Sequence, residues 1–144
     1  MTQTFTIPGT LPDLNAYINA ERANKYAAAK MKKDAESKII LHIRFAKLQP
    51  LTEYPVRIFY RWYCPNKRKD RSNISFAEKF VEDSLIRAGI LRNDGFDDVV
   101  DGVHECFIDR ANPQVVVTVG PWYHGQIWYQ HWCKPASEDN AHVK

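Results

Sequence analysis

The chain has 144 residues and a formal net charge of +3; 44% of its residues are hydrophobic and 26% are charged. These values are ordinary for a globular domain with its own core, and they exclude a disordered or collagen-like chain. No apolar run is long enough to span a membrane, and the first residues lack the features of a signal peptide, so we expect a cytoplasmic protein.

The charge is distributed unevenly along the chain. Basic side chains crowd residues 57–71, whereas acidic side chains dominate residues 78–109. This segregation indicates a polyanion-binding surface around an acidic centre, although for the lysine-rich stretch 21–47 a solvated helix face explains the charge equally well. The three cysteines are widely spaced and form no CxxC pair, which argues against a disulfide framework or a structural zinc site.

The first half of the chain predicts a strand, a long helical segment and a second strand. Residues 4–8 alternate briefly as a strand does, and residues 13–47 favour helix, with a break expected near residues 23–30 because one unbroken helix of that length is unusual in a small domain. Residues 56–63 are rich in β-branched and aromatic side chains and predict a strand. Its core face would carry Val56, Ile58, Tyr60 and Trp62.

The second half predicts one helix and two more strands. Residues 74–88 read as a helix, with Ser75 and Glu78 at the spacing of a capping box. Strands follow at about 99–109 and 114–119. We therefore expect an α+β fold of order β-α-β-α-β-β, with a small mixed sheet packed against two main helices. Residues 1–120 would form this domain, and 121–144 an aromatic and then polar tail.

The chemistry is concentrated in the basic loop, which we define as residues 66–71 (Asn-Lys-Arg-Lys-Asp-Arg), and in the turn that contains Asp94. Magnesium prefers oxygen ligands and needs only a few carboxylates, and cations beside them can hold a phosphate backbone. Asp70 and Asp94 flank the predicted helix and could converge on one ion. Each also has a simpler explanation, because Asp70 can cap a helix and Asp94 lies in an Asn-Asp-Gly turn.

An ordered set of residues resembles the RusA family of Holliday junction resolvases, particularly its phage-borne branch. The set comprises Lys69-Asp70-Arg71-Ser72-Asn73, then Lys79, Asp83 and Leu85, then the run from Ala88 to Asp94. The opening segment from Ile7 to Tyr17, which contains Asn15, looks like the family's proline-rich N-terminal segment. The resemblance spans about residues 3–119.

The resemblance implies a homodimeric, magnesium-dependent endonuclease, with manganese as a possible substitute, that nicks four-way DNA junctions in pairs. By position, Asp70 and Asp94 would be catalytic metal ligands, with Ser72 and Asp83 beside them, and Lys79 would stabilise charge on the phosphate. The DNA-binding residues would be Lys67, Arg68, Lys69, Arg71, Asn73 and Asn15.

Ser72 departs from the family signature, which usually reads Asp-x-Asp-Asn. A neutral hydroxyl is a weaker magnesium ligand than a carboxylate, so the implied site lacks one negative charge. Glu82 or Asp83 could compensate, or the protein could bind branched or single-stranded DNA without cutting it. That binding role is the alternative function that the sequence leaves open.

Overall fold

A computed structural model describes residues 2–122 of the chain. Its elements are β1 (Gln3–Pro8), α1 (Leu14–Ala23), α2 (Lys25–Phe45), β2 (Val56–Cys64), α3 (Arg71–Ser75), α4 (Glu78–Arg87), β3 (Val99–Ile108) and β4 (Gln114–Pro121). The expected α+β class and element order are confirmed. Most of the predicted tail lies outside the described residues.

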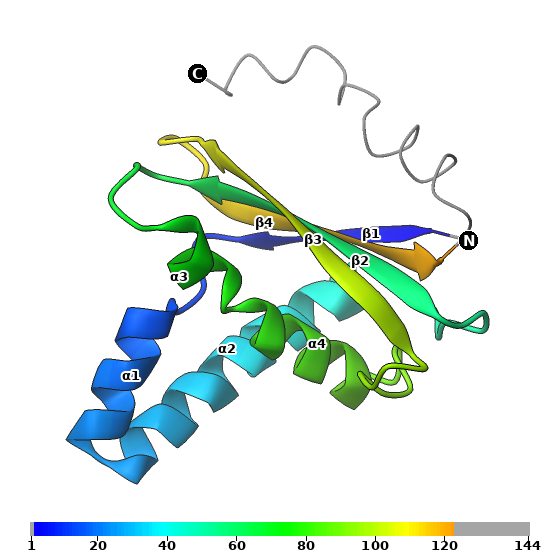
Figure 1. The fold of residues 1–144 in the computed structure, drawn as a ribbon, viewed down its shortest axis with the longest axis horizontal. Helices are drawn as coiled ribbons and strands as arrows, with labels where there is room; N and C mark the ends of the chain where they lie inside the picture. The colour runs from blue at the N-terminus through cyan, green and yellow to red at the C-terminus, as the bar shows by residue number, and fades with distance from the viewer. Residues whose placement is uncertain (1, 123–144) are drawn as a thin grey trace.

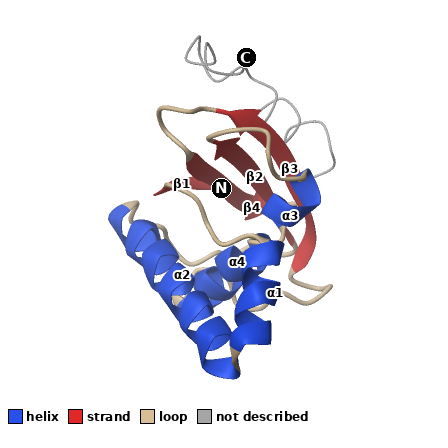
Figure 2. Cartoon of the chain, turned by 90° about the vertical axis from the view of Figure 1, so that its left-hand side faces the viewer, coloured by secondary structure: helices blue, strands red, loops and turns tan. Residues whose placement is uncertain are grey.

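The sheet is mixed, and its strand order is β1-β4-β2-β3. β4 pairs antiparallel with both β1 and β2, whereas β2 and β3 run parallel and are joined by the crossover through α3 and α4. The helices all lie on one face of the sheet (Figures 1 and 2). In the described part of the chain, no helix is both long and apolar enough to cross a bilayer.

The core forms between this sheet face and the helices. β2 contributes Val56, Ile58, Tyr60 and Trp62, all at most 2% exposed, so the face predicted from period-2 alternation is confirmed. α2 and α4 supply the opposing layer with Ile39, Ile43, Phe80, Val81 and Leu85.

The long helical segment is broken at Asn24, inside the range predicted for the break. Asn24 has an extended backbone, and its side-chain oxygen accepts a hydrogen bond from the Ala27 amide at 2.8 Å, which caps the start of α2. α1 is capped in the same way by Asp13, whose carboxylate accepts from the Ala16 amide at 2.8 Å.

The single helix predicted over 74–88 is wrong in two respects. The chain forms α3 and α4 with a break at residues 76 and 77, and Ala77 precedes α4 without any side-chain cap. The Ser75 hydroxyl bonds back to the Ser72 carbonyl, so the capping box with Glu78 does not form. Phe76, in the break, and Phe80 of α4 both pack against Tyr17 of α1, at centroid distances of 5.4 and 5.9 Å.

Candidate nucleic-acid and metal site

The two ends of the sheet carry different parts of the candidate site. At one end the Asp109 amide bonds the Cys64 carbonyl at 2.8 Å, which sets the β3–β4 turn beside the start of the basic loop. At the other end the Val56 amide bonds the Asp98 carbonyl, also at 2.8 Å, which fixes the segment that follows Asp94. α3 and α4 run between these two ends.

Lys79 is the centre of an acidic cluster, which we define as Glu78, Glu82, Asp83 and Asp94. Its ammonium lies 3.4 Å from an Asp83 carboxylate oxygen and 3.5 Å from one of Asp94. The charge of Asp83 raises the pKa of Lys79 more than burial lowers it, and Asp94 adds to the rise. The structure thus brings together three of the residues that the resemblance singles out, and Lys79 stays protonated at neutral pH.

Glu82 lies in the same cluster, half-buried. Burial, and then the negative charges of Glu78 and Asp94, raise the pKa of Glu82 to about 7, against the smaller opposing effect of Lys79. Lys32 of α2 also faces the cluster, with its ammonium 3.3 Å from Asp83. The four carboxyl groups still outnumber these two lysines, so the cluster has a surplus of negative potential.

His104 connects this cluster to the sheet. Its Nε2 lies 2.9 Å from the Glu78 carboxylate, and its Nδ1 lies 3.0 Å from the indole nitrogen of Trp62. An indole N–H can only donate, so Nδ1 must be the acceptor and Nε2 must carry the proton given to Glu78. His104 is thus a neutral imidazole with both nitrogens engaged, which leaves it no lone pair for a metal.

Glu78 fits against β3 because residue 102 is a glycine. A Cβ at Gly102 would lie 2.7 Å from a Glu78 carboxylate oxygen and 3.3 Å from the Tyr60 ring. Neither Glu78 nor His104 is among the site residues predicted from the sequence. Alternation puts Gly102, His104 and Cys106 on the same face of a strand, but nothing in that pattern connects His104 to Glu78 of α4.

Asp70 lies outside the acidic cluster. It precedes α3 without a side-chain capping bond, and it lines an open hollow with Arg71, Ser72, Ser75, His104 and Cys106, which we call the Asp70 hollow. His104 belongs to both places, since it lines this hollow and bonds Glu78. Within residues 2–122, no three carboxylate, imidazole or thiol groups are arranged to hold one metal ion.

The residues of the basic loop are exposed, as phosphate contacts require, but they are not equally available. Lys69 donates to Asp13 at 2.6 Å, whereas Lys67, Arg68 and Arg71 are exposed and form no ion pair with the carboxylates of residues 2–122. Asn73 and Asn15 are tied together, because the Asn73 side-chain oxygen accepts from the Asn15 amide at 3.0 Å. The N-terminal segment is therefore fastened to the loop and to α3.

No known protein-family model matches this sequence, and no curated protein matches it. The resemblance to RusA proteins rests on the residues quoted above alone.

Proposed function

We propose that the protein is a structure-selective endodeoxyribonuclease that resolves four-way DNA junctions by paired nicking, in the manner of the RusA family. The observation that carries the proposal is the Lys79 ammonium held by Asp83 and Asp94 at an exposed site on the domain that also bears the basic loop. Phosphodiester cleavage develops negative charge on the phosphate, and a fixed, protonated lysine stabilises that charge.

The carboxylate and hydroxyl oxygens of the candidate site are ligands that suit magnesium. No three carboxylate, imidazole or thiol groups of residues 2–122 are already arranged around one ion position. The resemblance would give the ion Asp70, Asp94, Ser72 and Asp83 as oxygen donors. In residues 2–122 these donors form two separate pairs, Asp83 with Asp94 in the acidic cluster and Asp70 with Ser72 in the Asp70 hollow. When bound, the ion would supply positive charge at the scissile phosphate and help to activate water. Manganese, with similar oxygen-ligand preferences, would substitute.

Other residues of the chain would bind the DNA and position the acidic side chains. Lys67, Arg68 and Arg71 would bind the DNA backbone, because they are exposed cations on one loop. His104 would hold Glu78 in position through its donated hydrogen bond. The neutral imidazole cannot add positive charge that would compete with a metal ion. A homodimer, which the resemblance implies, would present two such sites to the two strands that must be nicked.

The test is cleavage of a synthetic four-way junction in magnesium, with Asp94→Asn as the loss-of-function variant. We expect paired nicks from the wild-type protein and none from Asp94→Asn, while both bind the junction. Asp97→Asn is the matched control, since Asp97 is an exposed acid three residues further along the same segment. Uncut junctions at high protein concentration in both magnesium and manganese would refute the enzymatic role.

A non-catalytic DNA-binding role is the second candidate, favoured by the serine at position 72 and by the ammonium that already neutralises part of the Asp83 and Asp94 charge. If it holds, the wild-type protein binds branched or single-stranded DNA in a salt-sensitive way without cutting it. Ser72→Asp would then create cleavage by adding a carboxylate to the Asp70 hollow. If the protein is a nuclease, the wild-type protein already cuts the junction, and Ser72→Asp lowers the magnesium concentration needed for cutting.

A further inference from the structure

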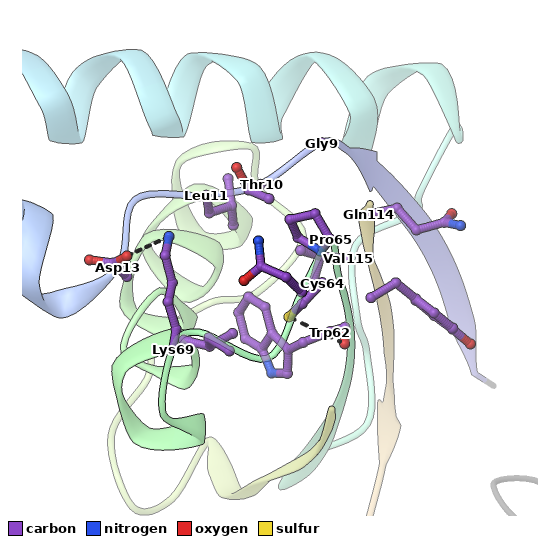
Figure 3. A pocket seen from close by; sticks show the side chains of 13 residues that line it. Gly9, Thr10, Leu11, Asp13, Trp62, Cys64, Pro65, Lys69, Gln114 and Val115 are labelled. Carbon is purple, nitrogen blue, oxygen red and sulfur yellow. Dashed lines mark hydrogen bonds and ion pairs between the residues drawn. The ribbon is translucent and has the colours of Figure 1, made fainter. Parts of the chain in front are cut away.

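A second cavity, distinct from the Asp70 hollow, is lined in part by the basic loop. It has a volume of about 170 Å³ and is enclosed by the segment after β1, the end of β2 with the basic loop, Ile74 of α3 and the start of β4 (Figure 3). Lys69 lines this cavity, whereas the next residue, Asp70, lines the hollow. The loop therefore contributes successive residues to two different concave surfaces.

The walls of this cavity, which we call the Trp62 cavity, are mainly apolar. Leu11, Trp62, Pro65, Ile74 and Val115 provide the apolar surface. Pockets for drug-sized ligands occupy roughly 300–1,000 Å³, so this smaller space suits one flat ring system better than a large cofactor.

Trp62 makes the cavity rigid before any ligand arrives. Its indole N–H is bonded to His104 at 3.0 Å, and its ring stacks on Tyr60 at a centroid distance of 5.5 Å and an interplanar angle of 9°. With only 2% of its surface exposed, Trp62 is the fixed floor of the cavity, so little ordering free energy is lost there when a ring enters.

A few polar groups are held at the edge of the cavity. Asp13 accepts from the Ala16 amide and from Lys69, so its carboxylate position is fixed. The Asn66 side-chain oxygen accepts from the Arg68 amide at 3.0 Å, which leaves the Asn66 NH₂ group as the donor for a ligand. Apolar walls with fixed donors and acceptors at the rim match a nucleobase, which has apolar faces and a polar edge.

We propose that the Trp62 cavity binds one unstacked nucleobase of the DNA strand whose phosphates lie on the basic loop. The inference rests on the proposed function, because it takes DNA as the ligand of the loop. Bases at the crossover of a branched junction are less constrained by stacking than those in a continuous duplex, and taking one from there costs less. The captured base would fix the register of the strand at the loop, one residue away from Asp70.

The experiment scans a four-way junction with single abasic nucleotides and measures each dissociation constant by fluorescence anisotropy. For the wild-type protein we expect one position near the crossover at which loss of the base weakens binding about tenfold, the effect of losing one stacked base. Elsewhere the change should stay below about twofold.

Two variants then link that position to the cavity. Cys64→Leu puts a larger side chain into the cavity wall, and Asn66→Ala removes the rim donor; in both, the abasic effect at the sensitive position should fall below about twofold. Asn112→Ala, an exposed asparagine in the β3–β4 turn, is the control and should keep it. Because Asn66 is exposed, its variant keeps the test valid even if Cys64→Leu fails to fold.

The outcomes separate the two proposals. Junction binding with a uniform abasic response, or a sensitive position unchanged in both cavity variants, overturns the nucleobase site and leaves the nuclease proposal standing. Failure of the wild-type protein to bind any junction overturns both.

Discussion

Lys79 illustrates how one residue can serve two carboxylates at once. It lies one helical turn before Asp83, and the segment after α4 returns to bring Asp94 against the same ammonium. The Lys79–Asp83 spacing of four residues is visible in the sequence, because such pairs are neighbours on a helix. The approach of Asp94 depends on how that segment folds back, which no local pattern specifies.

We expect Lys79→Met to lower junction cleavage by about 100-fold or more, because one preformed charge-stabilising donor is typically worth that much. Binding of the junction should change little, since the cations of the basic loop remain. Single-turnover cleavage and anisotropy measurements on the same preparation separate the two effects. Lys30→Met is the control, as Lys30 makes a comparable exposed pair with Asp34; equal rates for both variants would contradict the role of Lys79.

Three further residues, Asn73, Asn15 and His104, make contacts within the domain that the sequence did not predict. Asn73 and Asn15 were expected to contact DNA by resemblance, and the structure shows them bonded to each other across 58 positions of the chain. Their DNA contacts remain predictions. His104 escaped notice because an isolated histidine in a strand has no informative spacing; its two hydrogen bonds follow from the pairing of β2 with β3.

Among the elements, strands were predicted more accurately than helix ends. Period-2 alternation identified β2 within one residue, because one face of the strand is buried along its length. The break between α3 and α4 was missed because the residues around it keep the apolar spacing of one helix: Phe76 and Phe80, four residues apart, both pack against Tyr17 of α1. Local helix propensity does not show where such a helical run is interrupted in the folded chain.

The start of α1 should be sensitive to pH through Asp13. Burial raises the pKa of Asp13, but the hydrogen bond and charge of Lys69 together with the backbone amides of Ala16 and Asn15 outweigh it, so the net pKa is lowered. A lowered folded-state pKa contributes stability that is present above the unfolded value of about 3.9 and is lost as the pH falls below it.

We therefore expect Asp13→Ala to lower the free energy of unfolding by about 1 kcal/mol at pH 7, the usual cost of losing an N-cap, and by less at pH 3. Urea denaturation at both pH values measures this. Asp34→Ala removes only an exposed pair and should change stability by less than about 0.5 kcal/mol. If Asp13→Ala lowers the free energy of unfolding equally at both pH values, the charge of the Asp13 carboxylate does not contribute to stability.

The contact between α2 and α4 contains a buried charge. Glu36 is 3% exposed; Arg87 bonds one of its oxygens, and the other lies 3.8 Å from the Lys32 ammonium, too far for a hydrogen bond. We expect Arg87→Ala to cost about 1–3 kcal/mol, because a buried carboxylate loses its principal partner. Thermal and urea unfolding would detect it, with Arg22→Ala in the exposed last turn of α1 as the control.

Pairing Arg87→Met with Glu36→Met tests the cause of that destabilisation. Replacing both charged residues by apolar ones removes the unpaired carboxylate, so most of the stability should return. A double variant as unstable as Arg87→Ala would contradict the unpaired carboxylate as the cause, because methionine keeps most of the apolar stem of the arginine.

On the scale of the whole molecule, the segregation of charge seen in the sequence separates in space into the basic loop and the acidic cluster. The sequence showed the basic loop as a local run of cations and the predominance of acids over residues 78–109, but not which acids gather around Lys79. It could not show that Lys69 is partly neutralised by Asp13, 56 positions earlier, because that pair forms only when the chain after β1 packs beside the loop. Nor could it show the Trp62 cavity, whose walls come from four separate segments.

The salt dependence of DNA binding tests whether the cations of the basic loop contact the DNA phosphates. Removing one cation that neutralises a phosphate of duplex DNA should reduce the slope of log K against log salt by about 0.9. We expect Arg68→Ala to show that reduction and Lys69→Ala to show a smaller one, because Lys69 already shares its charge with Asp13. Lys25→Ala, at the start of α2, should leave the slope unchanged; equal slopes for all three variants would remove the basic loop from the DNA interface.

The position of β2 within the sheet has a consequence for dynamics. It is paired along both edges, antiparallel to β4 and parallel to β3, and its core face is almost fully buried. Its amide hydrogens should therefore exchange with deuterium only through global unfolding, whereas those of the outer strands β1 and β3 exchange through smaller local openings. The basic loop leaves directly from the end of this slowly exchanging strand, so its attachment point should persist for as long as the domain stays folded.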